Sequence, residues 1–125
     1  MRVAIVGAGM AGLACARALA AAGHVPLLFD KGRGPGGRMS TRRTEHDGRT
    51  LTFDHGAQYF TARDDAFVAL VRELEAEGAV VRWPTVGDDA WTGAARMSEP
   101  VAALAARFEV HFGTVVETIA VAEEG

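Results

Sequence analysis

The N-terminal sequence passes from a short apolar run directly into a glycine-rich turn. The run at residues 3–6 predicts a strand buried on both faces, as in the middle of a parallel sheet. Gly7, Gly9 and Gly12 then have the spacing of the dinucleotide fingerprint, which needs a tight turn, close approach to a diphosphate and close helix packing. Amides at the start of the following helix favour bound anions. The stretch therefore predicts a nucleotide site.

The residues that follow complete a strand–helix–strand unit. Residues 13–22 predict a helix that ends at Gly23, a favourable C-terminal cap, and residues 25–29 predict a second buried strand with Pro26 near its start. Asp30 follows about 20 residues beyond the glycines, where an acid accepts hydrogen bonds from the adenosine ribose. Because this acid disfavours a 2′-phosphate, the pattern favours FAD or NAD over NADP.

Composition limits the possible classes of protein. A chain of 125 residues with 49% hydrophobic content suffices for one compact domain, but not for a complete two-domain redox enzyme. The net charge of -3 argues against a nucleic-acid binder. The single cysteine, Cys15, lies among alanines and is interpreted as a small core residue, which is compatible with a reducing cytoplasm. No apolar run reaches transmembrane length, so we expect a soluble cytoplasmic protein without membrane partners.

A basic, glycine-rich segment follows the proposed ribose-binding acid. Residues 31–43 contain five positive charges and no acid. We expect this loop to close over the same diphosphate. A solvated surface loop is the alternative, but arginines alone would not require the Gly36–Gly37 pair.

Together with residues 54–60 (Asp-His-Gly-Ala-Gln-Tyr-Phe), these motifs resemble the flavin-containing amine oxidase superfamily, and in particular its bacterial renalase-like FAD-dependent oxidoreductases. The resemblance extends from Met1 to roughly Val121, and its specificity is concentrated before Phe60. It implies an α/β protein with a Rossmann-like FAD-binding βαβ fold and a mainly parallel sheet, truncated before the substrate domain. It also implies FAD as the cofactor.

The predicted site combines the glycine turn, the ribose acid, the basic loop, two small residues beside the flavin and one valine beside the adenine. The cofactor-binding candidates are Gly7, Ala8, Gly9, Met10, Ala11, Gly12, Asp30, Lys31, Arg33, Gly36, Gly37, Arg38, Met39, Gly56, Ala57 and Val116. By resemblance, His55, Gln58 and Tyr59 are weak catalytic candidates, and each has an ordinary structural alternative. No metal site is predicted, because no His, Cys, Asp or Glu spacing suits one.

Two amphipathic helices are predicted downstream. The first opens at Thr61 in capping-box style with Asp64 and ends at Gly78, and the second has Ser98 as its N-cap. Their predicted inward residues are Phe67, Leu70, Val71 and Leu74 in the first helix, and Val101, Leu104 and Ala105 in the second.

The remaining segments predict short strands and turns. Strands are expected at residues 51–54 (half-buried), 79–83, 108–112 and 114–121, and a turn at residues 123–125. Residues 85–96 are interpreted as a loop in which Asp88 and Asp89 are turn residues. The whole chain, residues 1–125, is predicted to be an FAD/NAD(P)-binding domain, with residues 84–97 as a shortened loop where a substrate domain would branch off.

The resemblance implies an oxidoreductase that transfers a hydride from a small amine or a dihydronicotinamide-type substrate to flavin, with reoxidation by dioxygen. Members of the family are normally longer, so a truncated FAD-binding module without turnover is one alternative. An NAD-binding Rossmann domain is another, although it would not need Gly36–Gly37–Arg38 or residues 54–60. The expected partners are a small-molecule substrate and, through surfaces left open by the short chain, a second copy.

Overall fold

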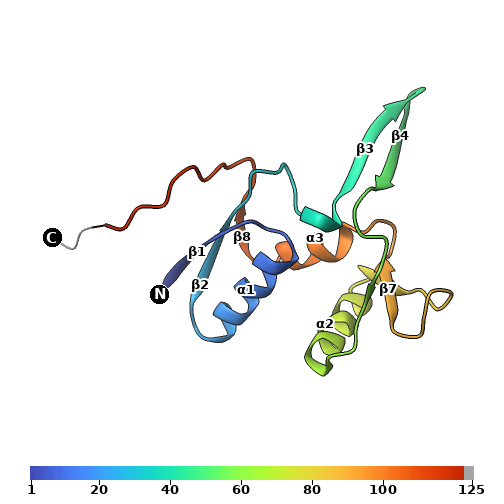
Figure 1. Cartoon of the computed structure of the whole chain (residues 1–125), viewed down its shortest axis with the longest axis horizontal. Helices are drawn as coiled ribbons and strands as arrows, with labels where there is room; N and C mark the ends of the chain where they lie inside the picture. Colours follow the sequence, from blue (N-terminus) through green and yellow to red (C-terminus); the bar gives the residue numbers. More distant parts are fainter. Residues whose placement is uncertain (123–125) are drawn as a thin grey trace.

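The structure is a computed structural model that describes residues 1–122, so the turn expected at residues 123–125 lies outside it. Figure 1 shows a parallel sheet beside α1 and α3, a projecting hairpin, and a second sheet beside α2. In chain order the elements are β1 (Arg2–Val6), α1 (Met10–Ala21), β2 (Val25–Phe29), a 3-10 helix η1 (Gly37–Met39), β3 (Thr41–His46), β4 (Arg49–Asp54), β5 (Phe60–Thr61), α2 (Asp65–Ala76), β6 (Val80–Arg82), β7 (Ala90–Gly93), α3 (Glu99–Ala105) and β8 (Glu109–His111).

The predicted strand–helix–strand unit is present as β1, α1 and β2. Both pairings in its sheet, β1 with β2 and β2 with β8, are parallel, which gives the order β1-β2-β8. Helix α1 ends where Gly23 adopts a φ of 83°, and the amide of His24 donates to the carbonyl of Leu19 at 2.9 Å. The predicted Rossmann-like α/β fold with a parallel sheet is confirmed.

Strand β1 differs from the expectation that it lies buried on both faces. It pairs only with β2, its residues alternate between exposed and half-buried, and Val6 is 59% exposed. The order β8-β2-β1 is one half of a doubly wound sheet, in which a further strand covers β1. Within residues 1–122 no strand pairs with this side of β1, so the expectation is wrong for this chain.

Strands β3 and β4 form an antiparallel hairpin that projects from the rest of the molecule (Figure 1). Asp47 and Gly48 turn the chain with φ values of 48° and 71°, as a two-residue hairpin loop requires. The prediction of a half-buried strand is wrong here, because Leu51 and Phe53 are 37% and 54% exposed. In the described chain the hairpin therefore has no buried face.

The antiparallel sheet beside α2 contains a strand that the sequence did not predict. Strand β7 lies between β5 and β6, and its Trp91 is only 3% exposed. Residues 85–96 are thus not simply a loop. The prediction failed because β7 is four residues long and obtains its hydrogen bonds from a strand on each side, of which β5 is distant in the sequence.

Helix α2 begins later than its capping-box pattern suggested. Its N-cap is Asp64, whose carboxylate accepts a 3.0 Å hydrogen bond from the amide of Phe67, whereas Thr61 pairs with Ala90 in the sheet. The predicted apolar face is confirmed, with Val71 and Leu74 fully buried and Phe67 and Leu70 packed against the core. Gly78, with a φ of 75°, follows the C-terminal end.

Helix α3 has Ser98 as its N-cap, as predicted, and buries its three expected residues in the core. It leads into β8. The strand expected at residues 114–121 is wrong: this segment has no partner strand among residues 1–122, and Val115, Ile119 and Val121 are 66%, 83% and 95% exposed. Alternating apolar residues do not form a strand without a neighbour that accepts their hydrogen bonds.

The core joins the parallel sheet to the α2 region. It includes Leu13 of α1, Leu28 of β2, Val71 of α2 and Leu104 of α3. Cys15 is not part of it, contrary to the interpretation as a core residue, because it is exposed. Since α1 buries Leu13 and Ala16, a residue between them points away from the core.

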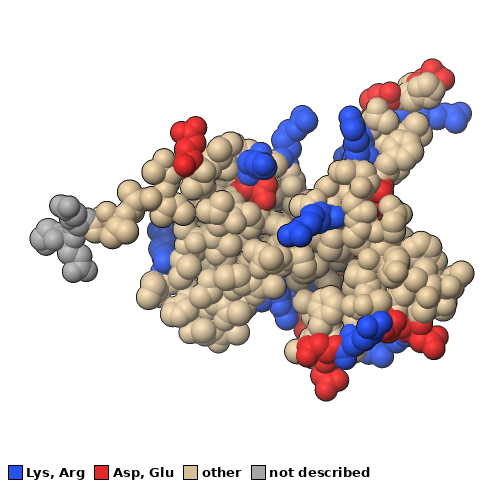
Figure 2. Space-filling view, viewed as in Figure 1, with Lys and Arg blue, Asp and Glu red and all other residues tan. Residues whose placement is uncertain are grey.

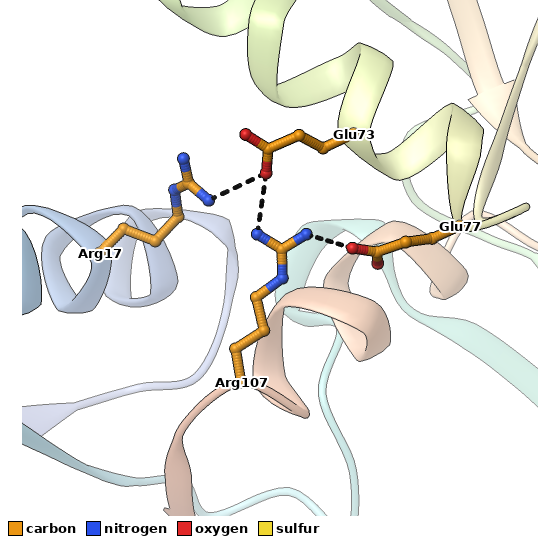
Figure 3. Close-up of polar contacts among 4 residues, drawn as sticks. All are labelled: Arg17, Glu73, Glu77 and Arg107. Atoms are coloured by element: carbon orange, nitrogen blue, oxygen red, sulfur yellow. Dashed lines mark hydrogen bonds and ion pairs between the residues drawn. The ribbon is translucent and has the colours of Figure 1, made fainter.

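A network of ion pairs joins α1, α2 and the segment after α3 (Figure 3). Glu73 of α2 lies 3.7 Å from Arg17 of α1 and 3.1 Å from Arg107, and Arg107 also lies 2.6 Å from Glu77. Partial burial lowers the pKa of Arg107, but hydrogen bonds to Glu73 and Glu77 outweigh it and the net shift is upward. The network therefore holds α2 against α1 and the segment after α3.

Arg107→Gln should lower the free energy of unfolding by about 1 kcal/mol, because it removes two partly exposed ion pairs from this network. Urea unfolding measures the change. Arg72→Gln is the control, since Arg72 makes a single 3.9 Å pair with Glu75 within α2. Equal losses in the two variants would show that the network adds nothing beyond ordinary surface pairs.

Candidate cofactor-binding site

The glycine turn between β1 and α1 is formed by backbone groups in close contact. Gly7 has a φ of 102°, and its amide donates a 2.7 Å hydrogen bond to the carbonyl of Phe29 at the end of β2. A Cβ atom added to Gly12 would overlap the carbonyl oxygen of Gly7. Helix α1 can therefore begin directly beside the turn, as the fingerprint predicts.

The carboxylate of Asp30 is fixed by two backbone amides. Its Oδ2 accepts from the amide of Ala8 and its Oδ1 from the amide of Gly32, both at 2.7 Å. A carboxylate has about four acceptor positions, so capacity for ligand hydroxyl groups remains. Ala8 is itself buried and its amide is already used, so it positions the acid within the predicted site.

The second glycine pair packs against the first turn. A Cβ atom on Gly37 would lie 3.5 Å from the Cα of Gly9, and Gly37 has a φ of 54°. Gly36 is buried, and a Cβ there would lie 2.8 Å from the Cα of Ser40. The expected close approach of backbone thus brings the basic loop beside the glycine turn.

A first cavity of about 550 Å³ opens at the carboxyl ends of β1 and β2. Ligands of open α/β sheets bind at these ends of the strands. The predicted residues that line it are Gly7, Asp30, Lys31, Gly37 and Val116. The structure therefore brings together residues more than 100 positions apart in the chain.

A second cavity, also of about 550 Å³, adjoins the first and shares Gly37 and Ser40 with it. Arg38, His55, Gly56 and Ala57 complete its lining. The amide of Ala57 donates to the carbonyl of Arg38 at 3.0 Å, and the hydroxyl of Ser40 lies 3.3 Å from Nε2 of His55. The predicted flavin-side residues thus form a compartment next to the proposed dinucleotide cavity.

Two of the three weak catalytic candidates lie outside both cavities. Nε2 of Gln58 donates to the backbone carbonyl of Asp54 at 2.7 Å. The backbone carbonyl of Gln58 accepts from the hydroxyl of Thr92. The ring of Tyr59 packs edge-on against Trp83, with 6.1 Å between centroids. A catalytic role for either residue stays a prediction, and only His55 lines a cavity.

The basic side chains of the loop line three different cavities. Lys31 lines the first cavity and Arg38 the second, whereas Arg33 lines a third cavity with Arg42 and Arg43. A contact between Arg33 and FAD stays a prediction.

Met10, Ala11 and Met39, which were also predicted, line neither of the first two cavities. Met10 and Met39 pack against the core, and Ala11 is exposed in the first turn of α1.

The sequence reasoning missed seven residues of the first cavity. They are Val6, Phe29, Gly32, Gly34, Ser40, Thr114 and Val115, and Ser40 also lines the second cavity. The position of Phe29 directly before the ribose acid was a usable signal, as was the inclusion of Thr114 and Val115 in the adenine segment. Nothing about Ser40 in the sequence distinguishes it.

The adjacent aspartates form a turn, as predicted. Asp89 pairs with Arg63, and the hydrogen bond from this arginine lowers the pKa of the Asp89 carboxyl. Among residues 1–122, no three His, Cys, Asp or Glu side chains are grouped to hold a metal ion. Within the same range, none of the helices is long and apolar enough to cross a membrane.

Comparison with known proteins agrees with this geometry. The NAD(P)-binding Rossmann-like domain family matches residues 5–74, which is more than half of the chain. The chain therefore belongs to the NAD(P)-binding Rossmann-like domain family.

Individual relatives are amine oxidases and desaturases. A 15-cis-phytoene desaturase of Synechococcus elongatus is 39% identical over 77 residues, 62% of this chain and 16% of that protein. An L-amino-acid oxidase of Pseudechis australis is 53% identical over 47 residues, 38% of this chain and 9% of that protein. A putrescine oxidase double-mutant structure is 36% identical, covering 60% of this chain and 16% of its own, with a TM-score of 0.44. The chain spans less than a fifth of these relatives.

Gly12→Ala should lower the free energy of unfolding by about 1–3 kcal/mol, because the added Cβ meets a backbone carbonyl that cannot move without opening the turn. Gly34→Ala is the matched control, since a Cβ there meets nothing within 4 Å. Thermal and urea unfolding measure both variants. If Gly12→Ala is as stable as the control, α1 does not pack on the turn as described.

Proposed function

We propose that this chain is the cofactor-binding part of an FAD-dependent oxidoreductase of the amine oxidase type, related to the renalase-like enzymes. The observation that supports this most directly is the pair of adjoining cavities that share Gly37 and Ser40. FAD needs room for an adenosine diphosphate and, beyond it, for a flat ring. The two cavities offer this succession.

The residues of the first cavity suit the adenosine and diphosphate end of FAD. Asp30 is held in place by backbone amides and keeps acceptor capacity for ribose hydroxyls. Gly9, the N-cap of α1, does not line the cavity but packs against Gly37, which does; because Gly9 has no side chain to cap the helix, the amides of the first helical turn are available to a diphosphate. Lys31 adds a positive charge to the same cavity.

The residues of the second cavity suit the approach of a ring. Gly56 and Ala57 present small side chains, and a Cβ on Gly56 would overlap the carbonyl oxygen of Arg38. His55, hydrogen-bonded to Ser40, and Arg38 are polar side chains of this compartment. When bound, the flavin would supply the acceptor for a hydride from a small amine or dihydronicotinamide-type substrate, with dioxygen as the final oxidant.

Two alternatives remain within the same family. A module that binds FAD without turnover would use the same two cavities. An NAD-binding domain accounts for the first cavity but gives no role to the second. Cytoplasmic location and self-association are further proposals, and the unpaired edge of β1 is where a second copy would add.

The visible absorption spectrum of the purified protein, after incubation with FAD and gel filtration, tests the proposal. Flavin bands that coelute with the protein support FAD binding, and anaerobic bleaching by an amine or a dihydronicotinamide supports turnover. Retained flavin that neither donor bleaches supports the non-catalytic module. A colourless protein that binds NAD contradicts the flavin assignment.

Asp30→Ala should weaken FAD retention by about 1.5–3 kcal/mol, because it removes hydrogen bonds to a charged carboxylate. Equilibrium dialysis against FAD measures the loss. Asp88→Ala is the control, since Asp88 is an exposed acid in a turn. Circular dichroism verifies that both variants fold, and unchanged affinity in folded Asp30→Ala would place the ribose elsewhere.

A further inference from the structure

A third cavity of about 880 Å³ lies between the basic loop, β3 and the start of α3. It shares Gly34 and Ser40 with the first cavity but contains neither the glycine turn nor Asp30. The charged and polar side chains that line it include Arg33, Arg42, Arg43, Arg96, Ser98 and Glu99. It therefore adjoins the proposed FAD site at Gly34 and Ser40 but has a different set of charged side chains.

The charge of this cavity is strongly unbalanced. Its single acid, Glu99, already lies 3.8 Å from Arg96 and accepts a 2.9 Å hydrogen bond from the amide of Ala95. In the part of the chain that the structure describes, Arg33, Arg42 and Arg43 make no ion pair. Figure 2 shows several Lys and Arg side chains spread over this face, above the parallel sheet and at the base of the hairpin. This concentration occurs in a chain with a net charge of -3.

The side chains also indicate what kind of anion fits. Guanidinium groups bind phosphate through paired hydrogen bonds, and several arginines that line one cavity suit an anion with several charges. Ser98 adds a hydroxyl that makes no cap hydrogen bond to α3. No aromatic side chain lines the cavity, so it lacks a surface on which a nucleotide base would stack.

We propose that this cavity is a second anion-binding site, which takes a compact, multiply charged anion of the phosphate class. Arg33 comes from the loop after β2, Arg42 and Arg43 from β3, and Arg96 from the turn before α3. Bound anion would neutralise these side chains and join the base of the hairpin to the rest of the fold. The site does not depend on flavin binding.

Isothermal titration of the full chain with inorganic diphosphate at low salt tests the proposal. We expect diphosphate to bind with an affinity that falls as NaCl screens the arginines. Arg42→Gln and Arg33→Gln should each weaken binding about tenfold or more, because each removes a charge-assisted hydrogen bond. Arg72→Gln on α2 is the control and should leave the affinity unchanged. Absence of binding, or equal loss in all three variants, overturns the proposal.

A second titration in saturating ADP separates this site from the first cavity. If diphosphate binds equally well with ADP present, it occupies a different site, as proposed. If ADP abolishes diphosphate binding, the anion occupies the dinucleotide cavity and the proposal is wrong. A chain that binds diphosphate with the expected arginine dependence but binds neither ADP nor FAD refutes the proposed function and supports the second anion site.

Discussion

The two hydrogen bonds to the carboxylate of Asp30 are the constraint on which the candidate site depends. They join the end of β2 to the turn after β1, through Ala8, and to the start of the basic loop, through Gly32. The amide of Asp30 also donates to the carbonyl of His111 in β8 at 2.9 Å. One residue therefore fixes the relative positions of three segments that line the first cavity. Any ligand hydroxyl that binds this acid meets a group already held in position.

Where structure is determined locally, the sequence was sufficient to predict it. The spacing of Gly7, Gly9 and Gly12 dictates a turn and a helix start, and Asp30 follows a strand predicted with its exact bounds. The same holds for α3, whose buried residues follow from helical period. These elements were predictable because each is specified by residues that lie close together in the sequence.

Elements that depend on distant partners could not be predicted in the same way. Strand β7 exists because β5 and β6 pair with it, and the segment at residues 114–121 remains without a strand because nothing pairs with it. Leu51 and Phe53 are exposed for a similar reason, because no other element among the described residues packs over the hairpin. The third cavity also escaped prediction, because Arg96 comes to line one cavity with residues of the basic loop only through the folding of the chain between them.

The incomplete pairing of the parallel sheet has a consequence for handling the isolated chain. In residues 1–122 no strand pairs with the outer side of β1, and such an edge is a template for β-augmentation by an extended peptide. If a second copy adds to this edge, as proposed above, colloidal behaviour in solution would depend on chain concentration. A synthetic peptide that binds as a strand along this edge of β1 would then keep the domain monomeric.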